Sequence, residues 1–168
     1  MITLVLGGAR SGKSAVAERR ACALAGGAGA VAYVATAIPG NDADFAARIR
    51  AHQDRRPAHW VTVEAGDDLV GALGSLDENT VALVDSLGTW VAAQPDLAID
   101  VGGLVTVLRA RAGPSVLVSD EVGLGVHPST EAGLRFRDAL GEFNVAIAEV
   151  AEDVLLVVAG RVLPLERP

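Results

Sequence analysis

An apolar stretch that runs directly into a glycine-rich turn constrains this chain more than any other feature. The turn reads GGARSGKS and has the spacing Gly7-x-x-x-x-Gly12-Lys13-Ser14. This spacing is typical of a P-loop, in which backbone N–H groups curl around the phosphates of a nucleotide. Residues 2–6 before the turn predict a buried strand, and residues 13–24 after it predict a helix. The helix would direct its positive N-terminal end at the same phosphates.

The lysine in this turn has no equivalent elsewhere in the sequence. Lys13 is the only lysine, although the chain holds 14 lysine and arginine residues together. A turn that only required glycines would need neither this lysine nor the serine that follows. A compact ammonium reaches the β- and γ-phosphates as a point charge, and the Ser14 hydroxyl can bind Mg²⁺. A planar guanidinium does not replace it. We therefore predict that Lys13 is catalytic and that Ser14 is a metal ligand.

Strand-like and helix-like segments alternate along the rest of the chain. The predicted strands cover residues 30–36, 59–64, 80–85, 115–121 and 153–160. The predicted helices cover residues 41–56, 67–76, 98–112 and 132–151, whereas 86–97 is expected to be irregular and 161–168 to be a tail or edge strand. Continuous apolar strands separated by helices predict an α/β fold with a mainly parallel sheet and helices on both faces. A length of 168 residues predicts one catalytic domain, residues 1–168.

Composition excludes several classes of function. The net charge of −7 argues against a nucleic-acid partner, because no basic run beyond the turn would neutralise a phosphate backbone. Cys22 is the only cysteine, so neither an internal disulfide nor a cysteine-based metal site is expected. No apolar run is long enough to span a bilayer, and no basic segment precedes the first strand. A cytoplasmic protein without a membrane span is expected.

Polar side chains come at the ends of the predicted strands, where ligands gather in parallel sheets. They include Thr36, Glu64 and Asp85. Asp85 after VALV fits a Walker-B carboxylate that holds Mg²⁺, although a strand-terminal Asp also serves as a turn former or helix cap. The P-loop favours the metal role. Asp120 and Glu121 remain open between positioning substrate or metal and simply ending a strand in solvent.

A histidine in the segment RIRAHQDRRP permits two interpretations. On an ideal helix His52 shares a face with Phe45 and Ile49, which would make it a packing residue. Alternatively, a neutral imidazole attacks phosphorus and forms a covalent intermediate, while Arg55 and Arg56 steady the phosphate charge. The residues alone favour packing.

Several segments in order resemble one family: GGARSGKS, YVATA, RIRAHQDRRPAHW, VTVE, LVDSLGTW, DEVGLGVHP and FRDALGEFN. They are similar to the bifunctional adenosylcobinamide kinase / adenosylcobinamide-phosphate guanylyltransferase family of cobalamin biosynthesis. The resemblance implies a RecA-like P-loop NTPase fold and two reactions. The first moves the γ-phosphate of ATP or GTP to the hydroxyl of adenosylcobinamide. The second moves GMP from GTP through a histidine to the corrinoid phosphate, giving adenosylcobinamide-GDP.

The same resemblance assigns residues and partners. It makes His52 the guanylylated residue, and Ser14 and Asp85 the ligands of Mg²⁺. It implies GTP and ATP as substrates, a corrinoid as the second substrate and a homo-oligomer such as a trimer. The nucleotide-binding positions that it implies are Gly7, Gly8, Ala9, Arg10, Ser11, Gly12, Lys13, Ser14, Ala35, Thr36, Gln53, Asp54, Arg55, Arg56, Glu64 and Asp85.

The chain also departs from the family pattern. Asp120 stands where the family often has asparagine, and Ser129 stands where an acid is usual. We expect these positions to lie away from the P-loop and to affect corrinoid contacts or substrate preference. No role is expected for His127.

Two rival functions remain on the sequence alone. A single-activity P-loop kinase of small molecules would form no covalent GMP. A nucleotide-dependent interaction module would need no Mg²⁺ ligands, and the guanine-reading Asn-Lys-x-Asp of switch GTPases cannot occur because Lys13 is the only lysine.

Overall fold

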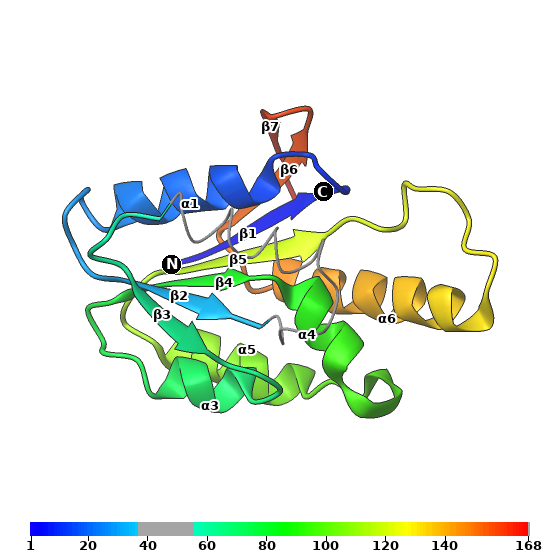
Figure 1. Ribbon diagram of the computed structural model, residues 1–168, viewed down its shortest axis with the longest axis horizontal. Helices are drawn as coiled ribbons and strands as arrows, with labels where there is room; N and C mark the ends of the chain where they lie inside the picture. The colour runs from blue at the N-terminus through cyan, green and yellow to red at the C-terminus, as the bar shows by residue number, and fades with distance from the viewer. Residues whose placement is uncertain (37–55, 168) are drawn as a thin grey trace.

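The computed structural model describes residues 1–36 and 56–167, which form a seven-stranded sheet. The strand order is β3-β2-β4-β5-β1-β6-β7 (Figure 1). The strands are β1 (Ile2–Gly7), β2 (Val31–Ala35), β3 (Val61–Glu64), β4 (Val81–Asp85), β5 (Ser115–Asp120), β6 (Asp153–Val158) and β7 (Arg161–Pro164). All neighbours pair in parallel except β7, which is antiparallel to β6 at the edge. The predicted mainly parallel sheet is confirmed.

Helices cover both faces of the sheet, as predicted. The described helices are α1 (Lys13–Leu24), α3 (Leu69–Gly74), α4 (Leu87–Ala93), α5 (Val101–Ala110), α6 (Glu131–Ala148) and the 3₁₀ turn η1 (Pro95–Leu97). Figure 1 shows α1 on one face of the sheet and α3, α5 and α6 on the other. Successive side chains along each strand point to opposite faces of the sheet, so every central strand contributes to an apolar core on each face.

The two cores divide each central strand between them. In β4, Val81 and Leu83 pack with α1, whereas Ala82 and Val84 pack with the helices of the opposite face. Burying an aliphatic side chain fully contributes about 1.5–3 kcal/mol, so the continuous apolar strands and the helix faces that cover them both stabilise the fold. Because both faces are covered, these strands show no polar alternation in the sequence.

The segment 86–97 corrects one prediction, because its first half is a regular helix, α4. The Ser86 side chain accepts from the backbone N–H of Thr89, and the Thr89 side chain bonds back to the Ser86 backbone. This capping box starts the helix, and Trp90 is buried against α6, with its ring centroid 5.8 Å from that of Phe143. Pro95 made the segment look irregular, whereas the cap and the buried face determine its structure.

Most other predicted elements are present with slightly different ends. The helix expected over 98–112 begins at Val101, because the Asp100 carboxylate accepts from Gly103 N and caps it. The tail is the edge strand β7. The predicted helix 41–56 falls outside the described residues apart from Arg56. Within residues 1–36 and 56–167, no helix is both long and apolar enough to cross a membrane.

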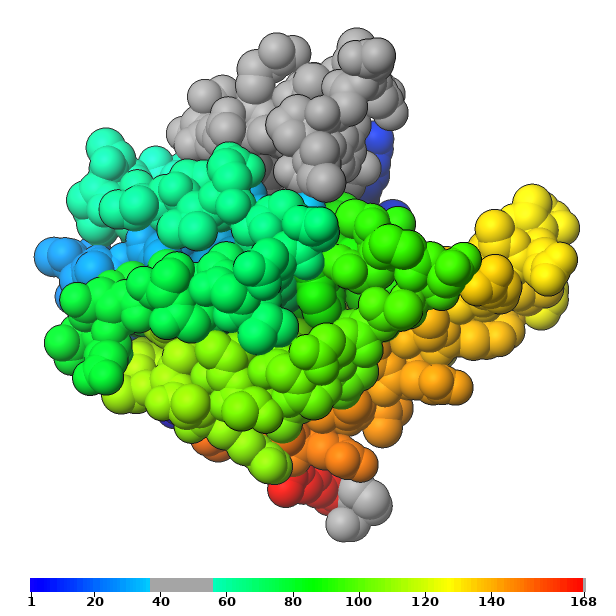
Figure 2. All heavy atoms as spheres, turned by 90° about the horizontal axis from the view of Figure 1, so that it is seen from below, coloured from blue at the N-terminus to red at the C-terminus, as the bar shows by residue number. Residues whose placement is uncertain are grey.

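Strand register brings the predicted site residues of the strands to one edge of the sheet, the edge at which the parallel strands have their carboxyl ends. Gly7 pairs with Asp120, and Ala35 pairs with both Glu64 and Asp85. β5 separates β1 from β4, so the P-loop strand and the Asp85 strand are two strand spacings apart. Beside this edge, residues 121–130 project from the body of the molecule as the yellow loop in Figure 2.

Candidate nucleotide site

The turn between β1 and α1 is a compact loop that requires glycine at two positions. A Cβ on Gly7 would lie 2.5 Å from Ser11 Oγ and 2.8 Å from the Val157 carbonyl oxygen. Gly12 has φ +93°, a left-handed conformation that side chains disfavour. Gly12 also precedes α1 and offers no side-chain oxygen to its first amides. The loop therefore leaves backbone N–H groups of a helix start available to an anion.

Lys13 is the first residue of α1, and its ammonium turns back over the loop. Its Nζ lies 2.6 Å from Asp120 Oδ1 and donates to the Gly8 carbonyl oxygen at 3.3 Å. The prediction that Asp120 lies away from the P-loop is wrong. β5 neighbours β1, so a residue at the end of β5 lies beside the loop that follows β1. This contact connects two residues that are far apart in sequence.

Asp85 ends β4 and is held by a residue that the sequence analysis missed. The buried Tyr33 hydroxyl donates to Asp85 Oδ2 at 2.8 Å. Burial, and secondarily the charge of Asp85, raise the pKa of Tyr33 far above its ordinary value. Tyr33 therefore stays a hydrogen-bond donor and orients the carboxylate. Its signal in the sequence was a single tyrosine within an aliphatic strand.

Arg56 extends this chain of contacts. Its guanidinium lies 3.2 Å from the centroid of the Tyr33 ring, and its Nη1 is 3.3 Å from Thr62 Oγ1. An arginine stacked on an aromatic ring is held by a cation–π interaction. Arg56 is thereby attached to the same edge of the sheet as Asp85.

Thr36 has a structural role in addition to its predicted contact with nucleotide. Its buried hydroxyl donates to the Ser86 carbonyl oxygen at 2.7 Å, and Ser86 N donates to the hydroxyl at 3.0 Å. Thr36 thus connects the end of β2 to the start of α4. A direct contact between Thr36 and nucleotide stays a prediction.

The remaining predicted residues divide into those at this edge and those outside the described chain. Ser14 lies half-buried in the first turn of α1, and Ala9 and Arg10 are exposed on the loop. Ala35 and Glu64 lie level with Asp85 across β2 and β3. The predicted residues outside the described ranges are His52, Gln53, Asp54 and Arg55.

The donor set fits Mg²⁺ held mainly by a nucleotide. Residues 1–36 and 56–167 contain no cluster of three or more His, Cys, Asp or Glu side chains suited to a metal. Mg²⁺ commonly takes only one or two protein carboxylates, and substrate phosphates and water supply its other ligands. Asp85 with the Ser14 hydroxyl would be such a set.

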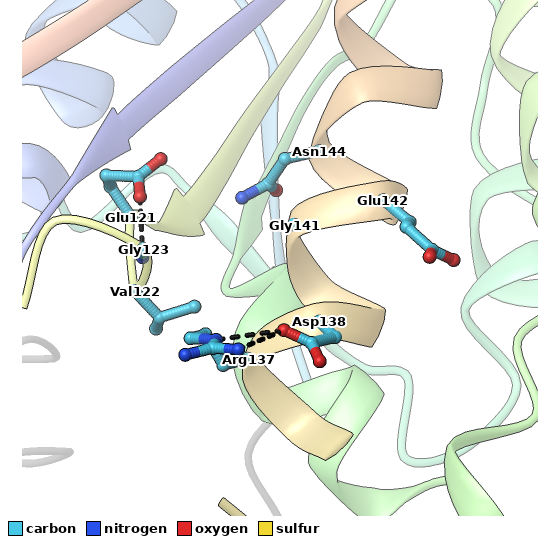
Figure 3. Close-up of a pocket in the computed structure, with 8 residues that line it drawn as sticks. All are labelled: Glu121, Val122, Gly123, Arg137, Asp138, Gly141, Glu142 and Asn144. Carbon is cyan, nitrogen blue, oxygen red and sulfur yellow. Dashed lines mark hydrogen bonds and ion pairs between the residues drawn. The ribbon is translucent and has the colours of Figure 1, made fainter. Parts of the chain in front are cut away.

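A hollow of about 370 Å³ lies beside this edge, between residues 121–123 and α6 (Figure 3). Asn144 lines it and was also missed from the sequence. Its Oδ1 accepts from Ser119 Oγ at 2.6 Å and its Nδ2 donates to the Asp120 carbonyl oxygen at 3.1 Å. The available signal in the sequence was an asparagine among the apolar positions of a predicted helix. Asn144 fixes the end of β5 and hence the backbone position of Asp120.

The chain matches the family described as cobinamide kinase / cobinamide phosphate guanyltransferase over residues 3–165. It belongs to this family. The bifunctional adenosylcobalamin biosynthesis protein CobP of Pseudomonas aeruginosa is 42% identical, over 99% of this chain and 98% of its own length. The corresponding CobU of Salmonella typhimurium is 38% identical over 95% and 97%. These matches therefore support the two predicted activities, adenosylcobinamide kinase and adenosylcobinamide-phosphate guanylyltransferase. They support neither of the two rival functions.

Solved structures support the fold independently. The ATPase domain of G40P has a TM-score of 0.53 at 11% identity, covering 92% of this chain and 68% of its own. The flagellar accessory protein FlaH from Methanocaldococcus jannaschii has a TM-score of 0.52 at 14% identity, covering 96% and 74%. At such low identity these similarities bear on the fold alone, and they agree with the predicted α/β fold.

Proposed function

We propose that this chain uses one nucleotide site for both reactions, phosphoryl transfer to adenosylcobinamide and GMP transfer through His52. The observation that carries the proposal is the arrangement at the strand edge, where Lys13 and Asp85 follow β1 and β4 and one strand lies between them. In the proposal the β- and γ-phosphates bind between the ammonium and the carboxylate.

In the kinase step the protein mainly positions and stabilises charge. Lys13 and the N-terminus of α1 would hold the β- and γ-phosphates, and their positive charge would offset the charge that develops on the leaving oxygen. Ser14 and Asp85 would hold the Mg²⁺, which supplies further charge neutralisation when bound. Tyr33 would keep the Asp85 carboxylate in one orientation through its 2.8 Å hydrogen bond.

The guanylyl step requires attack by a nucleophile at the α-phosphate. His52 is four residues before Arg56 in the sequence. Arg56 is attached at the site edge through Tyr33. Because it is so near Arg56 in the sequence, we propose that His52 is the residue that attacks the α-phosphate. An unprotonated imidazole would attack the α-phosphorus, the bond to the bridging oxygen would break, and pyrophosphate would leave with the electron pair.

Intact-mass measurement tests the function directly. After incubation with GTP and Mg²⁺, we expect a covalent adduct of one GMP per chain, and the adduct should disappear when the phosphorylated corrinoid is added. A parallel assay should show phosphorylation of adenosylcobinamide by ATP or GTP. Phosphorylation without any GMP adduct would instead indicate a single-activity kinase.

Substitution of Asp85 with asparagine tests the metal assignment. We expect the Asp85→Asn protein to need about tenfold more Mg²⁺ for half-maximal rate in both reactions, because a charged ligand is lost while Tyr33 can still donate to the amide oxygen. Rates measured against Mg²⁺ concentration provide the test, with thermal unfolding as a check of the fold. An unchanged Mg²⁺ dependence would leave Asp85 as the acceptor for Tyr33 only.

The proposal also includes the domain organisation, the oligomeric state and the location of the enzyme. A single catalytic domain over residues 1–168, a homo-oligomeric state and a cytoplasmic location are parts of it. The domain rests on chain length, the oligomeric state on the family resemblance and the location on composition.

A further inference from the structure

The ammonium that should bind the nucleotide is already paired within this chain. Lys13 Nζ lies 2.6 Å from Asp120 Oδ1, a distance typical of a strong charge-assisted hydrogen bond. The Lys13 side chain is 13% exposed and that of Asp120 is 31% exposed, so the pair is partly shielded from water. A triphosphate that binds Lys13 must therefore replace a carboxylate.

The surrounding structure fixes Asp120 in this position. Its backbone pairs with Gly7 in the β5–β1 register, and Asn144 donates to its carbonyl oxygen. Its other carboxylate oxygen, Oδ2, occupies the space above Gly88, where a Cβ would lie 2.4 Å away. The absence of a side chain at residue 88 makes room for the carboxylate beside the P-loop. The pair is thus a built feature of the site and not a surface contact between two long side chains.

We propose that Asp120 is an internal competitor of the nucleotide phosphates. It holds Lys13 in the nucleotide-free protein and gives it up when a triphosphate binds. The inference rests on the proposed nucleotide site. It assigns to Asp120 the selection of metal-bound over metal-free nucleotide, and this residue is one of the chain's departures from the family pattern.

Charge explains the selectivity. A metal-free triphosphate carries several negative charges, and binding at Lys13 brings them within a few ångströms of the displaced carboxylate. Like charges at this distance repel strongly in a partly shielded site. Mg²⁺ neutralises part of the phosphate charge and so reduces the repulsion. When the phosphates leave after transfer, the carboxylate regains Lys13, which favours release of the spent nucleotide.

The test compares the nucleotide affinity of the wild type with that of Asp120→Asn. Asparagine keeps the size of the side chain and an oxygen that accepts from Lys13, and it removes the charge. Calorimetric titration with a non-hydrolysable GTP analogue, first in EDTA and then in Mg²⁺, measures the dissociation constant. We expect Asp120→Asn to bind about tenfold more tightly than wild type in EDTA, and the difference to shrink severalfold in Mg²⁺.

Glu121→Gln is the matched control. It removes the same charge from the next residue, whose carboxylate accepts from Gly123 N at 2.7 Å, as the dashed line in Figure 3 shows. We expect its affinity to stay within about twofold of wild type, because the Glu121 carboxylate is bound to Gly123 N and not to Lys13. Asp120→Ser serves as a second variant should the asparagine protein fold poorly, and it should show the same tightening.

Each outcome decides the inference. Equal affinities of wild type and the Asp120 variants would overturn it, as would weaker binding by the variants or equal tightening in Glu121→Gln. A lower melting temperature with unchanged affinity would show that the pair only stabilises the fold. Failure of all proteins to bind the analogue, even with Mg²⁺, would overturn the proposed nucleotide site itself and the inference with it.

Discussion

Replacing Lys13 with alanine is expected to lower the rates of both phosphoryl and guanylyl transfer by about a hundredfold or more. In the proposed function both reactions use a triphosphate held by the same loop, and loss of one charge-assisted contact to the transition state typically costs a few kcal/mol. Steady-state rates of corrinoid phosphorylation and the rate of GMP adduct formation measure the effect. The two rates should fall together, because the lost contact serves both steps.

Two further variants sharpen this result. Lys13→Arg should also be impaired, because a planar guanidinium does not replace a compact ammonium on the loop. Arg109→Ala removes a positive charge from the exposed end of α5 and should leave both rates near those of wild type. If Lys13→Ala turned over normally in both assays, the P-loop would not be the nucleotide site. Thermal unfolding separates this from a folding defect, since removal of Lys13 also leaves Asp120 without this partner.

Replacing His52 with alanine is expected to abolish the GMP adduct and the guanylyl transfer, while phosphorylation of adenosylcobinamide persists. The γ-phosphoryl group can pass directly from nucleotide to hydroxyl, so the kinase step needs no covalent intermediate on the protein. Incubation with GTP labelled at the α-phosphate, followed by peptide mapping, should place the label on His52. The bond would be a phosphoramidate, stable in base and labile in acid.

The other two histidines provide the controls. His59 is exposed just before β3, and His127 lies 3.1 Å from Arg137 Nη1. Variants that replace either with alanine should still be labelled. Label on His59 or His127, or equal labelling of His52→Ala, would contradict the assignment. Adduct formation in the wild type should also fall at acidic pH, because a protonated imidazole has no lone pair for attack.

Local sequence patterns predicted much of the fold, because the helices and strands depend largely on residues close to one another in the sequence. The P-loop spacing gave the strand and helix around it, and α1 has the predicted bounds, Lys13–Leu24. Apolar runs identified the strands, since strands covered on both faces are continuously apolar. The failure at α4 has an equally local cause. The prediction followed Pro95, whereas the capping box of Ser86 and Thr89 starts the helix.

The contacts that refine the candidate site were not predictable in the same way. Tyr33 reaches Asp85 and Asp120 reaches Lys13 only because β2 neighbours β4 and β5 neighbours β1. Strand order is a property of the whole sheet, and no local pattern around Asp120 reports it. Sequence reasoning therefore identified Asp120 as unusual but placed its effect away from the P-loop.

The position of β5 between β1 and β4 has a practical consequence for engineering. Neighbouring strands are about 4.8 Å apart, so backbone hydrogen bonds set the interval between the P-loop strand and the Asp85 strand at about 10 Å. Exchanges among the apolar side chains of either core leave these hydrogen bonds in place, and volume-conserving exchanges alter stability only modestly. A laboratory that seeks a heat-tolerant catalyst can therefore make volume-conserving exchanges among the aliphatic residues of both cores, with Tyr33 retained, while the reaction geometry is preserved.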